Sequence, residues 1–172
     1  MALRKILKQD DSLLHAQCKP VEVFDEKLNN LLDDMVETLK KADGVGLAAP
    51  QIGVCRRICV LDLEEEDGII ELINPVIVKK SGRHRDIEGC LSCPNIWGYV
   101  VRPNKCLIKA QNRKGKFFEL EMKEMGARVA CHEIDHLEGI IFTQFVDEYV
   151  DPDDFEDDGK GRRRRRRRRG RR

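Results

Sequence analysis

The feature that most constrains the fold is a change in the spacing of apolar residues along the chain. Residues 24–44, FDEKLNNLLDDMVETLKKADG, place apolar side chains three and four positions apart, the spacing of an amphipathic helix. Asp25 is a suitable N-cap, and Gly44 can close this helix. Residues 126–142, GARVACHEIDHLEGIIF, return to helical spacing. The sequence therefore predicts one helix near each end of a long middle region.

The middle region has the short apolar runs and turn residues of β-strands. Residues 56–80 predict a strand, an acidic turn at Asp67-Gly68, a second strand and then a further strand. Residues 100–122 predict two strands around a turn at Lys114-Gly115. Strands outnumber helices and do not alternate with them. We therefore expect an α+β fold, with antiparallel sheets packed around the C-terminal helix and with an additional N-terminal helix.

Charge divides the 172 residues into a body and a tail. Ten arginines lie between Arg162 and Arg172; without them Lys+Arg falls from 32 to 22 against 31 Asp+Glu, so the body carries a formal charge of −9. The length suits one domain, which we place at residues 1–150. Residues 151–172 form an acidic linker and an arginine-rich tail. They have no apolar face to bury, and we expect them to be disordered.

The cysteine content and the N-terminus indicate a cytoplasmic protein without a membrane partner. No apolar run is long enough to span a bilayer, and the start MALRKILKQDDSLL has no apolar core or cleavage site of a signal peptide. The seven cysteines are odd in number and irregularly spaced, unlike the framework of a secreted disulfide protein.

The motif HEIDHLEG, residues 132–139, places chemistry on the second helix. His132 and His136 are four residues apart, so both imidazoles can face one ion, with the Glu133 carboxylate beside them as a possible base. Two histidines do not complete a catalytic metal site, which normally has three protein ligands. Phe142 occupies the place where one protease class has a third histidine, and Glu156 lies in the acidic linker.

A cysteine is the remaining source of a third ligand. Cys90 stands in EGCLSCP, a stretch expected to be a glycine-flanked turn, whereas Cys59 lies inside an apolar strand. A separate zinc knuckle is disfavoured, because Cys55 and Cys59 in an extended strand would be roughly 13 Å apart. A third unusual stretch, GVGLAAPQIG, predicts a backbone packed close to something, either as a tight connection or as a ligand loop with Gln51 as a donor.

In this order, GVGLAAPQIG, EGCLS and HEIDHLEG resemble the three motifs of the peptide deformylase family, and the resemblance extends from about Leu3 to Val146. It implies hydrolysis of the N-formyl group from nascent peptides that begin with formyl-methionine, with release of formate. By position in these motifs, the implied metal ligands are Cys90, His132 and His136, the general acid/base is Glu133, and the oxyanion donors are the Gln51 amide and the Leu91 backbone N–H.

The resemblance also implies a cofactor and a substrate pocket. One divalent metal ion is expected per chain, Fe²⁺ in cells, with Zn²⁺, Ni²⁺ or Co²⁺ as substitutes. The matching substrate-binding positions are Val45, Gly46, Leu47, Gly89, Met125 and Val129. Plain core packing explains the apolar ones equally well. Glu88 and Arg102 match positions expected to pair beside the Cys90 loop, and Cys93 stands where the family usually has an aliphatic residue.

Two other functions compete with this interpretation. A general HExxH peptidase would need a long cleft and explains neither Cys90 nor Gln51. A nucleic-acid-binding module could work through the tail arginines, which attract phosphate in a salt-dependent way. The chain carries no base-reading motif, so we expect ribosome or RNA association only as an accessory to an enzyme. The tail can equally fold back on its acidic linker.

Overall fold

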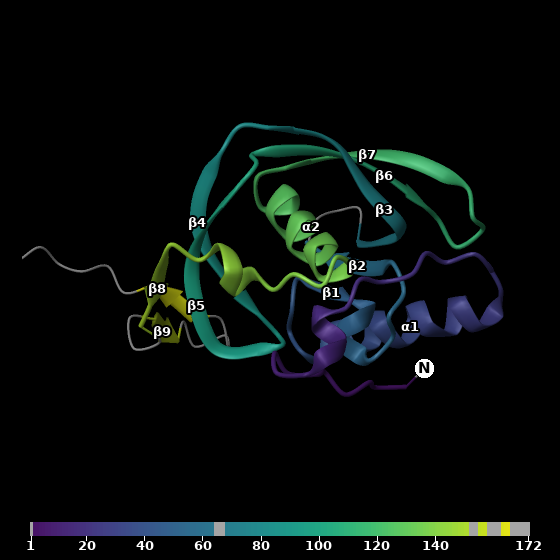
Figure 1. Ribbon diagram of the computed structural model, residues 1–172, viewed down its shortest axis with the longest axis horizontal. Coiled ribbons are helices and arrows are strands. Elements are labelled where there is room, and N and C mark those ends of the chain that lie inside the picture. Colours follow the sequence, from purple (N-terminus) through teal and green to yellow (C-terminus); the bar gives the residue numbers. More distant parts are fainter. Residues whose placement is uncertain (1, 64–67, 152–154, 158–162, 166–172) are drawn as a thin grey trace, which may run out of the picture.

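Ten strands and two α-helices build the part of the chain that this computed structural model describes, residues 2–63, 68–151, 155–157 and 163–165 (Figure 1). Every paired strand is antiparallel. The expected α+β class with antiparallel sheets is therefore confirmed. Within the described residues, no helix is long and apolar enough to cross a membrane.

Helix α1 (Glu26–Lys41) forms as its spacing predicts. The Asp25 side chain accepts a hydrogen bond from the Leu28 amide at 3.0 Å and caps the first turn. Its apolar face packs on a core cluster that includes Leu32, Met35 and Leu39. The prediction that Gly44 closes the helix is wrong. The helix ends at Lys41, and Asp43 takes the left-handed conformation, with φ 52°.

A five-stranded sheet runs in the order β1-β2-β3-β6-β7. Its strands are β1 (Gly46–Ala48), β2 (Ile58–Asp62), β3 (Ile69–Ser81), β6 (Lys105–Gln111) and β7 (Phe117–Lys123). The turn predicted at Lys114-Gly115 joins β6 to β7, and Gly115 has φ 75°, a conformation that glycine adopts without strain. The apolar stretch after residue 68 is a single long strand, whose pairing with β6 shifts register after Ile73.

A second sheet, in the order β4-β5-β8, carries the Cys90 segment. Its strands are β4 (His84–Cys90), β5 (Cys93–Arg102) and β8 (Glu148–Val150). The expectation that EGCLSCP is wholly a turn is only partly correct. Cys90 ends β4 and pairs with Cys93 at the start of β5, and only Leu91 and Ser92 form the turn between them. The third ligand candidate is therefore fixed at the closed end of a hairpin.

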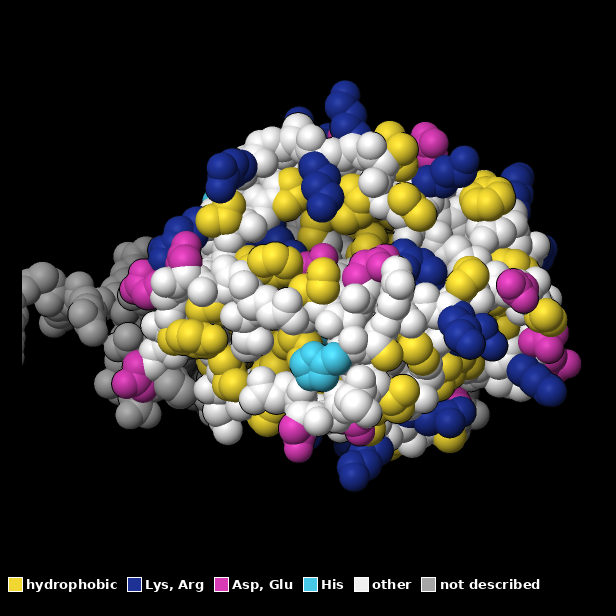
Figure 2. All heavy atoms as spheres, in the orientation of Figure 1, with side chains coloured by type: hydrophobic (Ala, Val, Ile, Leu, Met, Phe, Trp, Pro, Cys, Tyr) yellow, Lys and Arg dark blue, Asp and Glu magenta, His cyan; other side chains and the backbone are white. Residues whose placement is uncertain are grey.

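Helix α2 (Glu124–Leu137) runs through the middle of the molecule, with the strands of the larger sheet along one side and β4 and β5 beside it (Figure 1). Eleven of its fourteen residues are buried, the polar residues His132, Glu133 and His136 among them. On the face drawn in Figure 2, apolar side chains gather in a hollow over this part of the fold. The apolar side chains that give residues 126–142 their helical spacing include Val129, Ile134, Leu137 and Ile141, and all four are buried, although Ile141 follows the helix.

Three 3₁₀-helices connect these elements: η1 (Ser12–His15), η2 (Ala49–Ile52) and η3 (Phe142–Phe145). Beyond Val150, strand β9 (Phe155–Asp157) pairs with β10 (Arg163–Arg165). The rest of the predicted disordered segment, residues 152–154, 158–162 and 166–172, lies outside the described residues, and the domain boundary at residue 150 stays a prediction.

One buried carboxylate fastens the smaller sheet to α2. Glu88, on β4, accepts hydrogen bonds from Arg102 Nε at 2.8 Å, Arg128 Nη1 at 2.7 Å and His132 Nδ1 at 3.0 Å. Arg102 also pairs with Asp135 on α2. Burial opposes ionisation of Glu88, but the hydrogen bonds from His132 and Arg102 outweigh it and lower its pKa to about 2. The pairing expected between Glu88 and Arg102 is thus part of a larger buried cluster.

We predict that Glu88→Gln lowers the free energy of unfolding by about 3 kcal/mol or more at pH 7, because it removes the buried negative charge that pairs with Arg102 and Arg128. The pKa of Glu88 lies below its ordinary value of 4.5. Its ionisation therefore stabilises the fold fully above pH 4.5, and this contribution disappears as the pH falls toward 2. Urea unfolding of both proteins should show their difference shrinking across that window.

Glu121→Gln is the matched control, since Glu121 forms an exposed pair with Lys123 on β7. Glu121→Gln should change the free energy of unfolding little, both at pH 7 and below pH 4.5. A Glu88 variant as stable as wild type at pH 7 would contradict the role assigned to the buried cluster.

Candidate functional site

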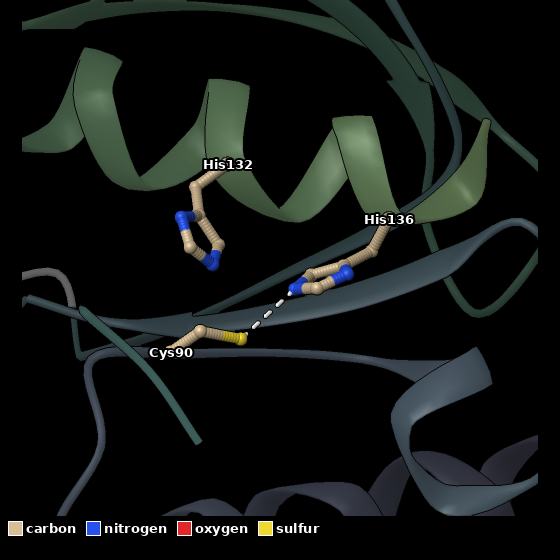
Figure 3. A group of neighbouring side chains, drawn as sticks. All are labelled: Cys90, His132 and His136. Carbon is tan, nitrogen blue, oxygen red and sulfur yellow. Dashed lines mark hydrogen bonds between the residues drawn. The ribbon is translucent and has the colours of Figure 1, made fainter. Parts of the chain in front are cut away.

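Cys90, His132 and His136, the three predicted metal ligands, meet between the end of β4 and α2 (Figure 3). One ligand atom from each side chain lies within 4.8 Å of the other two, and Cys90 Sγ is 3.3 Å from His136 Nε2. The two histidines share a face of the helix because four residues make about one turn. Within the described residues, this is the group of histidine, cysteine and acidic side chains that could hold a metal ion. The zinc knuckle, already disfavoured, gains no support.

The donor chemistry of the three side chains suits a cation. A hydrogen bond from the Cys93 thiol and others from the two histidines outweigh burial and lower the pKa of Cys90 far below the usual range, which favours the thiolate. His132 uses Nδ1 to bind Glu88, so Nε2 faces Cys90 and His136. A carboxylate on the far nitrogen is the usual way of orienting a histidine that binds metal. His136 Nδ1 is buried without a hydrogen-bond partner in the described structure.

Glu133 is buried beside this group with an unusual environment for a carboxylate. Its side chain is 4% exposed, and Oε2 has no hydrogen-bond partner among the described residues. Burial raises the pKa of Glu133 to about 7, against the opposing effect of the neighbouring His132 and His136 charges. Gly46 makes room for it, because a Cβ at that position would overlap the Glu133 carboxyl group. Glu133 is therefore suited to exchange a proton near neutral pH.

The Gln51 amide is held beside Cys90 by hydrogen bonds at both of its polar atoms. It lies in η2, is 1% exposed, and accepts a hydrogen bond from the Ala48 amide through Oε1 at 2.8 Å. Its Nε2 donates to Ser92 Oγ at 3.1 Å and lies 3.5 Å from Cys90 Sγ. GVGLAAPQIG thus forms a tight connection, in which the short helix η2 places the Gln51 amide beside Cys90. A role of this segment in ligand binding stays a prediction.

Leu91 lies in the hairpin turn directly after Cys90. Its side chain packs against the segment after α1, where a Cβ on Gly44 would come within 2.9 Å of it. Its carbonyl accepts a hydrogen bond from Lys8 Nζ at 3.3 Å. The N-terminal segment fastens the same region through backbone bonds from Leu7 to Gln51 and from Gln9 to Ser92. The segment after α1 and the N-terminal segment therefore both contact the turn that carries the Leu91 N–H.

A cavity of about 760 Å³ opens beside the group. Of the predicted substrate-binding residues, Val45, Gly46, Gly89, Met125 and Val129 line it, as do Gln51, Leu91 and Glu133. Leu47 does not. It is fully buried in the core cluster of α1. Val45 and Met125 are 51% and 56% exposed, so they stand at the mouth, whereas Val129 is buried and belongs also to the core.

Sequence reasoning missed four residues that shape this site. Ser92 orients Gln51, Arg128 and Asp135 complete the cluster around Glu88, and Trp97 lines the cavity. Gly89 packs directly against Trp97, because a Cβ there would overlap the indole ring. Ser92 could have been found, since it stands in the quoted EGCLS motif. The contacts of Arg128, Asp135 and Trp97 join separate segments of the chain, and no local sequence pattern predicts them.

Comparison with known proteins agrees with this geometry. The sequence model of the family described as polypeptide deformylase matches residues 3–151. A peptide deformylase of Caldicellulosiruptor bescii is 51% identical over 156 residues, covering 91% of this chain and 93% of that protein. Peptide deformylase 1 of Bacillus subtilis is 45% identical over 157 residues, covering 91% of this chain and 98% of that protein.

Solved structures agree as well. The crystal structure of a peptide deformylase from Legionella pneumophila superimposes with a TM-score of 0.82 at 44% identity, over 84% of this chain and 86% of that one. The family-model match over residues 3–151 includes the five-stranded sheet, the sheet β4-β5-β8, both α-helices and the site. The chain therefore belongs to the polypeptide deformylase family, the enzymes that remove the N-formyl group from nascent peptides.

Proposed function

We propose that this enzyme hydrolyses the formyl group of formyl-methionyl peptides with one divalent metal ion held by Cys90, His132 and His136, and with Glu133 as general acid and base. The observation that carries the proposal is the convergence of the three ligand atoms within 4.8 Å of one another, beside a buried carboxylate and an open cavity. Three protein ligands leave room for further coordination, as in catalytic sites generally.

A bound divalent cation would supply positive charge that makes water easier to deprotonate and that stabilises negative charge on the formyl oxygen. Thiolate and imidazole ligands suit iron, zinc, cobalt and nickel alike. Fe²⁺ is our proposal for the cell, with Zn²⁺, Ni²⁺ or Co²⁺ as substitutes. It rests on the family resemblance, since the donor set does not discriminate among these ions.

Glu133 moves the proton in the proposed reaction. A pKa near 7 lets its carboxylate accept a proton from the attacking water and return it to the amine nitrogen as the C–N bond breaks. One water is consumed, and formate and a free amino terminus are released. Its unpaired Oε2 is available for this transfer, because no protein group of the described structure occupies it.

Two donors are proposed to bind the oxygen of the formyl group as it gains negative charge. The Gln51 amide would give one hydrogen bond, and the Leu91 backbone N–H the other. The contacts with Ala48 and Ser92 fix the Gln51 amide before substrate arrives, which is the property that makes such donors effective. Each preorganised donor is worth on the order of 3 kcal/mol in the transition state.

The methionine side chain is proposed to enter the cavity. Val45 and Met125 stand at its mouth, and Val129 forms part of its wall. Gly46 and Gly89 let the backbone of both neighbouring segments approach, because side chains there would collide with Glu133 and Trp97. Leu47 would act only indirectly, by anchoring β1 in the core.

A cytoplasmic location and a weak association with the ribosome or RNA complete the proposal. Nascent peptides emerge from a particle rich in phosphate, and the ten arginines between Arg162 and Arg172 would bind it in a salt-dependent way. The acidic linker competes for the same arginines. Strand β9 already pairs with β10, so part of the tail lies against its own chain.

The role of Glu133 predicts that Glu133→Ala retains metal and loses activity by a factor on the order of 10² or more. The variant removes a base and no ligand, so its metal content should stay near that of wild type. Formate release from a formyl-methionyl peptide and elemental analysis measure the two properties. Glu121→Ala, an exposed carboxylate on β7, should change neither. Loss of metal from Glu133→Ala would show that Glu133 is misassigned.

The role of Cys90 predicts a different outcome for Cys90→Ser. A hydroxyl is a poorer ligand than a thiolate for these ions, so the occupancy or the identity of the bound metal should change. Cys93→Ser is the matched control, since Cys93 is buried and contacts Cys90 without belonging to the ligand group. The proposal fails if Cys93→Ser loses the metal and Cys90→Ser keeps it.

We predict that the arginine-rich tail contributes to ribosome association and not to catalysis. Truncation after Asp158 should leave kcat/KM on a short formyl-methionyl peptide unchanged, because the site lies wholly within earlier residues. Co-sedimentation of both forms with ribosomes over a salt series should show binding by the full chain that weakens with salt and is lost on truncation. Equal sedimentation of the two forms would remove the proposed role of the arginines.

A further inference from the structure

We propose that Cys18 and Cys55 are a modification site, an oxidisable pair of thiols that forms an intramolecular disulfide with low-molecular-weight disulfides as the oxidant class. The two Sγ atoms lie 3.7 Å apart, although 37 residues separate the cysteines in the sequence. All seven cysteines are reduced in this structure. The pair lies outside the catalytic machinery described above.

The backbone places the two residues opposite each other. Lys19 and Arg56 form a parallel β-bridge, in which the Lys19 amide donates to the Cys55 carbonyl at 3.3 Å and the Arg57 amide donates to the Lys19 carbonyl at 2.9 Å. Cys18 and Cys55 each precede a partner in that bridge. Neighbouring strands lie about 4.8 Å apart, within the range of Cα separations that a disulfide spans. Closing the bond from 3.7 Å requires the sulfurs to approach by about 1.7 Å, which side-chain rotation can supply.

Accessibility distinguishes this pair from the other thiols. Cys55 is only partly buried, so a small oxidant can reach it, while Cys18 is 5% exposed directly behind it. Cys106 and Cys131 also contact each other, but both are 2% exposed. Cys59 is fully buried in β2. Cys90 and Cys93 belong to the proposed metal site.

The order of the chemical steps follows from the same difference. The Cys55 thiolate attacks the oxidant disulfide, forms a mixed disulfide and releases one thiolate. Cys18 then loses its proton and attacks the Cys55 sulfur, which releases the second thiolate. Two protein thiols are oxidised, one disulfide is reduced to two thiols, and two protons pass to the released thiolates. Burial raises the pKa of Cys18 to about 12, so Cys18 is suited to the second, intramolecular step rather than the first.

The two segments that would be joined both hold the C-terminal end of α2. The Cys18 amide donates to the Leu137 carbonyl at 2.8 Å. Glu138, the next residue, pairs with Arg57 and accepts a hydrogen bond from Gln17 at 3.0 Å. A Cys18–Cys55 bond would therefore join covalently the two segments that contact Leu137 and Glu138, directly after His136. Because it cross-links a long loop of the unfolded chain, it should stabilise the folded protein.

The test exposes the full-length protein to oxidised glutathione, alkylates the remaining thiols after denaturation, and maps the digested protein by mass spectrometry. A peptide pair linked through Cys18 and Cys55 should appear. Oxidation should also raise Tm by about 5 °C or more, and a reductant should reverse the shift. These readouts do not depend on catalysis or on bound metal.

Two variants separate the pair from general thiol oxidation. Cys55→Ser should give neither the linked peptide nor the Tm shift. Cys106→Ser, which disrupts a different contacting pair, should retain both. The proposal is overturned if glutathione remains on Cys55 without a linked peptide. It is also overturned if the Tm shift persists in Cys55→Ser, since another pair would then be responsible.

Discussion

The buried carboxylate of Glu88 is the interaction on which the rest of the site depends. It accepts hydrogen bonds from Arg102, Arg128 and His132 at distances of 3.1 Å or less, and so joins β4, β5 and α2 at one point. A buried charge is tolerated only where such partners surround it. The same carboxylate sets the orientation of the His132 ring. The packing of the fold and the geometry of the proposed metal site therefore have a common origin.

Glu88 and Glu133, the two buried acidic residues near the proposed metal site, differ in how their negative charge is compensated. Glu88 is satisfied by cations and stays ionised, whereas Glu133 has an unpaired oxygen and a pKa raised to about 7. The absence of a side chain at Gly46 leaves the space that the buried Glu133 carboxyl group occupies. The first arrangement suits a structural role, and the second suits the proton transfer that we propose for Glu133.

Sequence patterns predicted the parts of this structure that are local. The helical spacing of residues 24–44 and the turn at Gly115 follow from neighbouring residues, and both are present. Strands β4 and β5 were not predicted, because glycines, prolines and charged residues interrupt their apolar pattern. Pairing of the two strands with each other and their contacts with α2 stabilise them in spite of that pattern. The three predicted metal ligands were identified from short sequence motifs. Residues that act across segments, such as Arg128 and Asp135, required the folded chain, as did the placement of Leu47 in the core.

We propose that deformylation by this chain depends on a metal held by Cys90, His132 and His136. The most direct test is formate release from a formyl-methionyl peptide by the protein before chelation, after chelation and after addition of one equivalent of Fe²⁺, Zn²⁺, Ni²⁺ or Co²⁺, without oxygen. We expect activity to fall with removal of one ion per chain and to return with a suitable ion. Full activity in protein verified to contain no metal would contradict it.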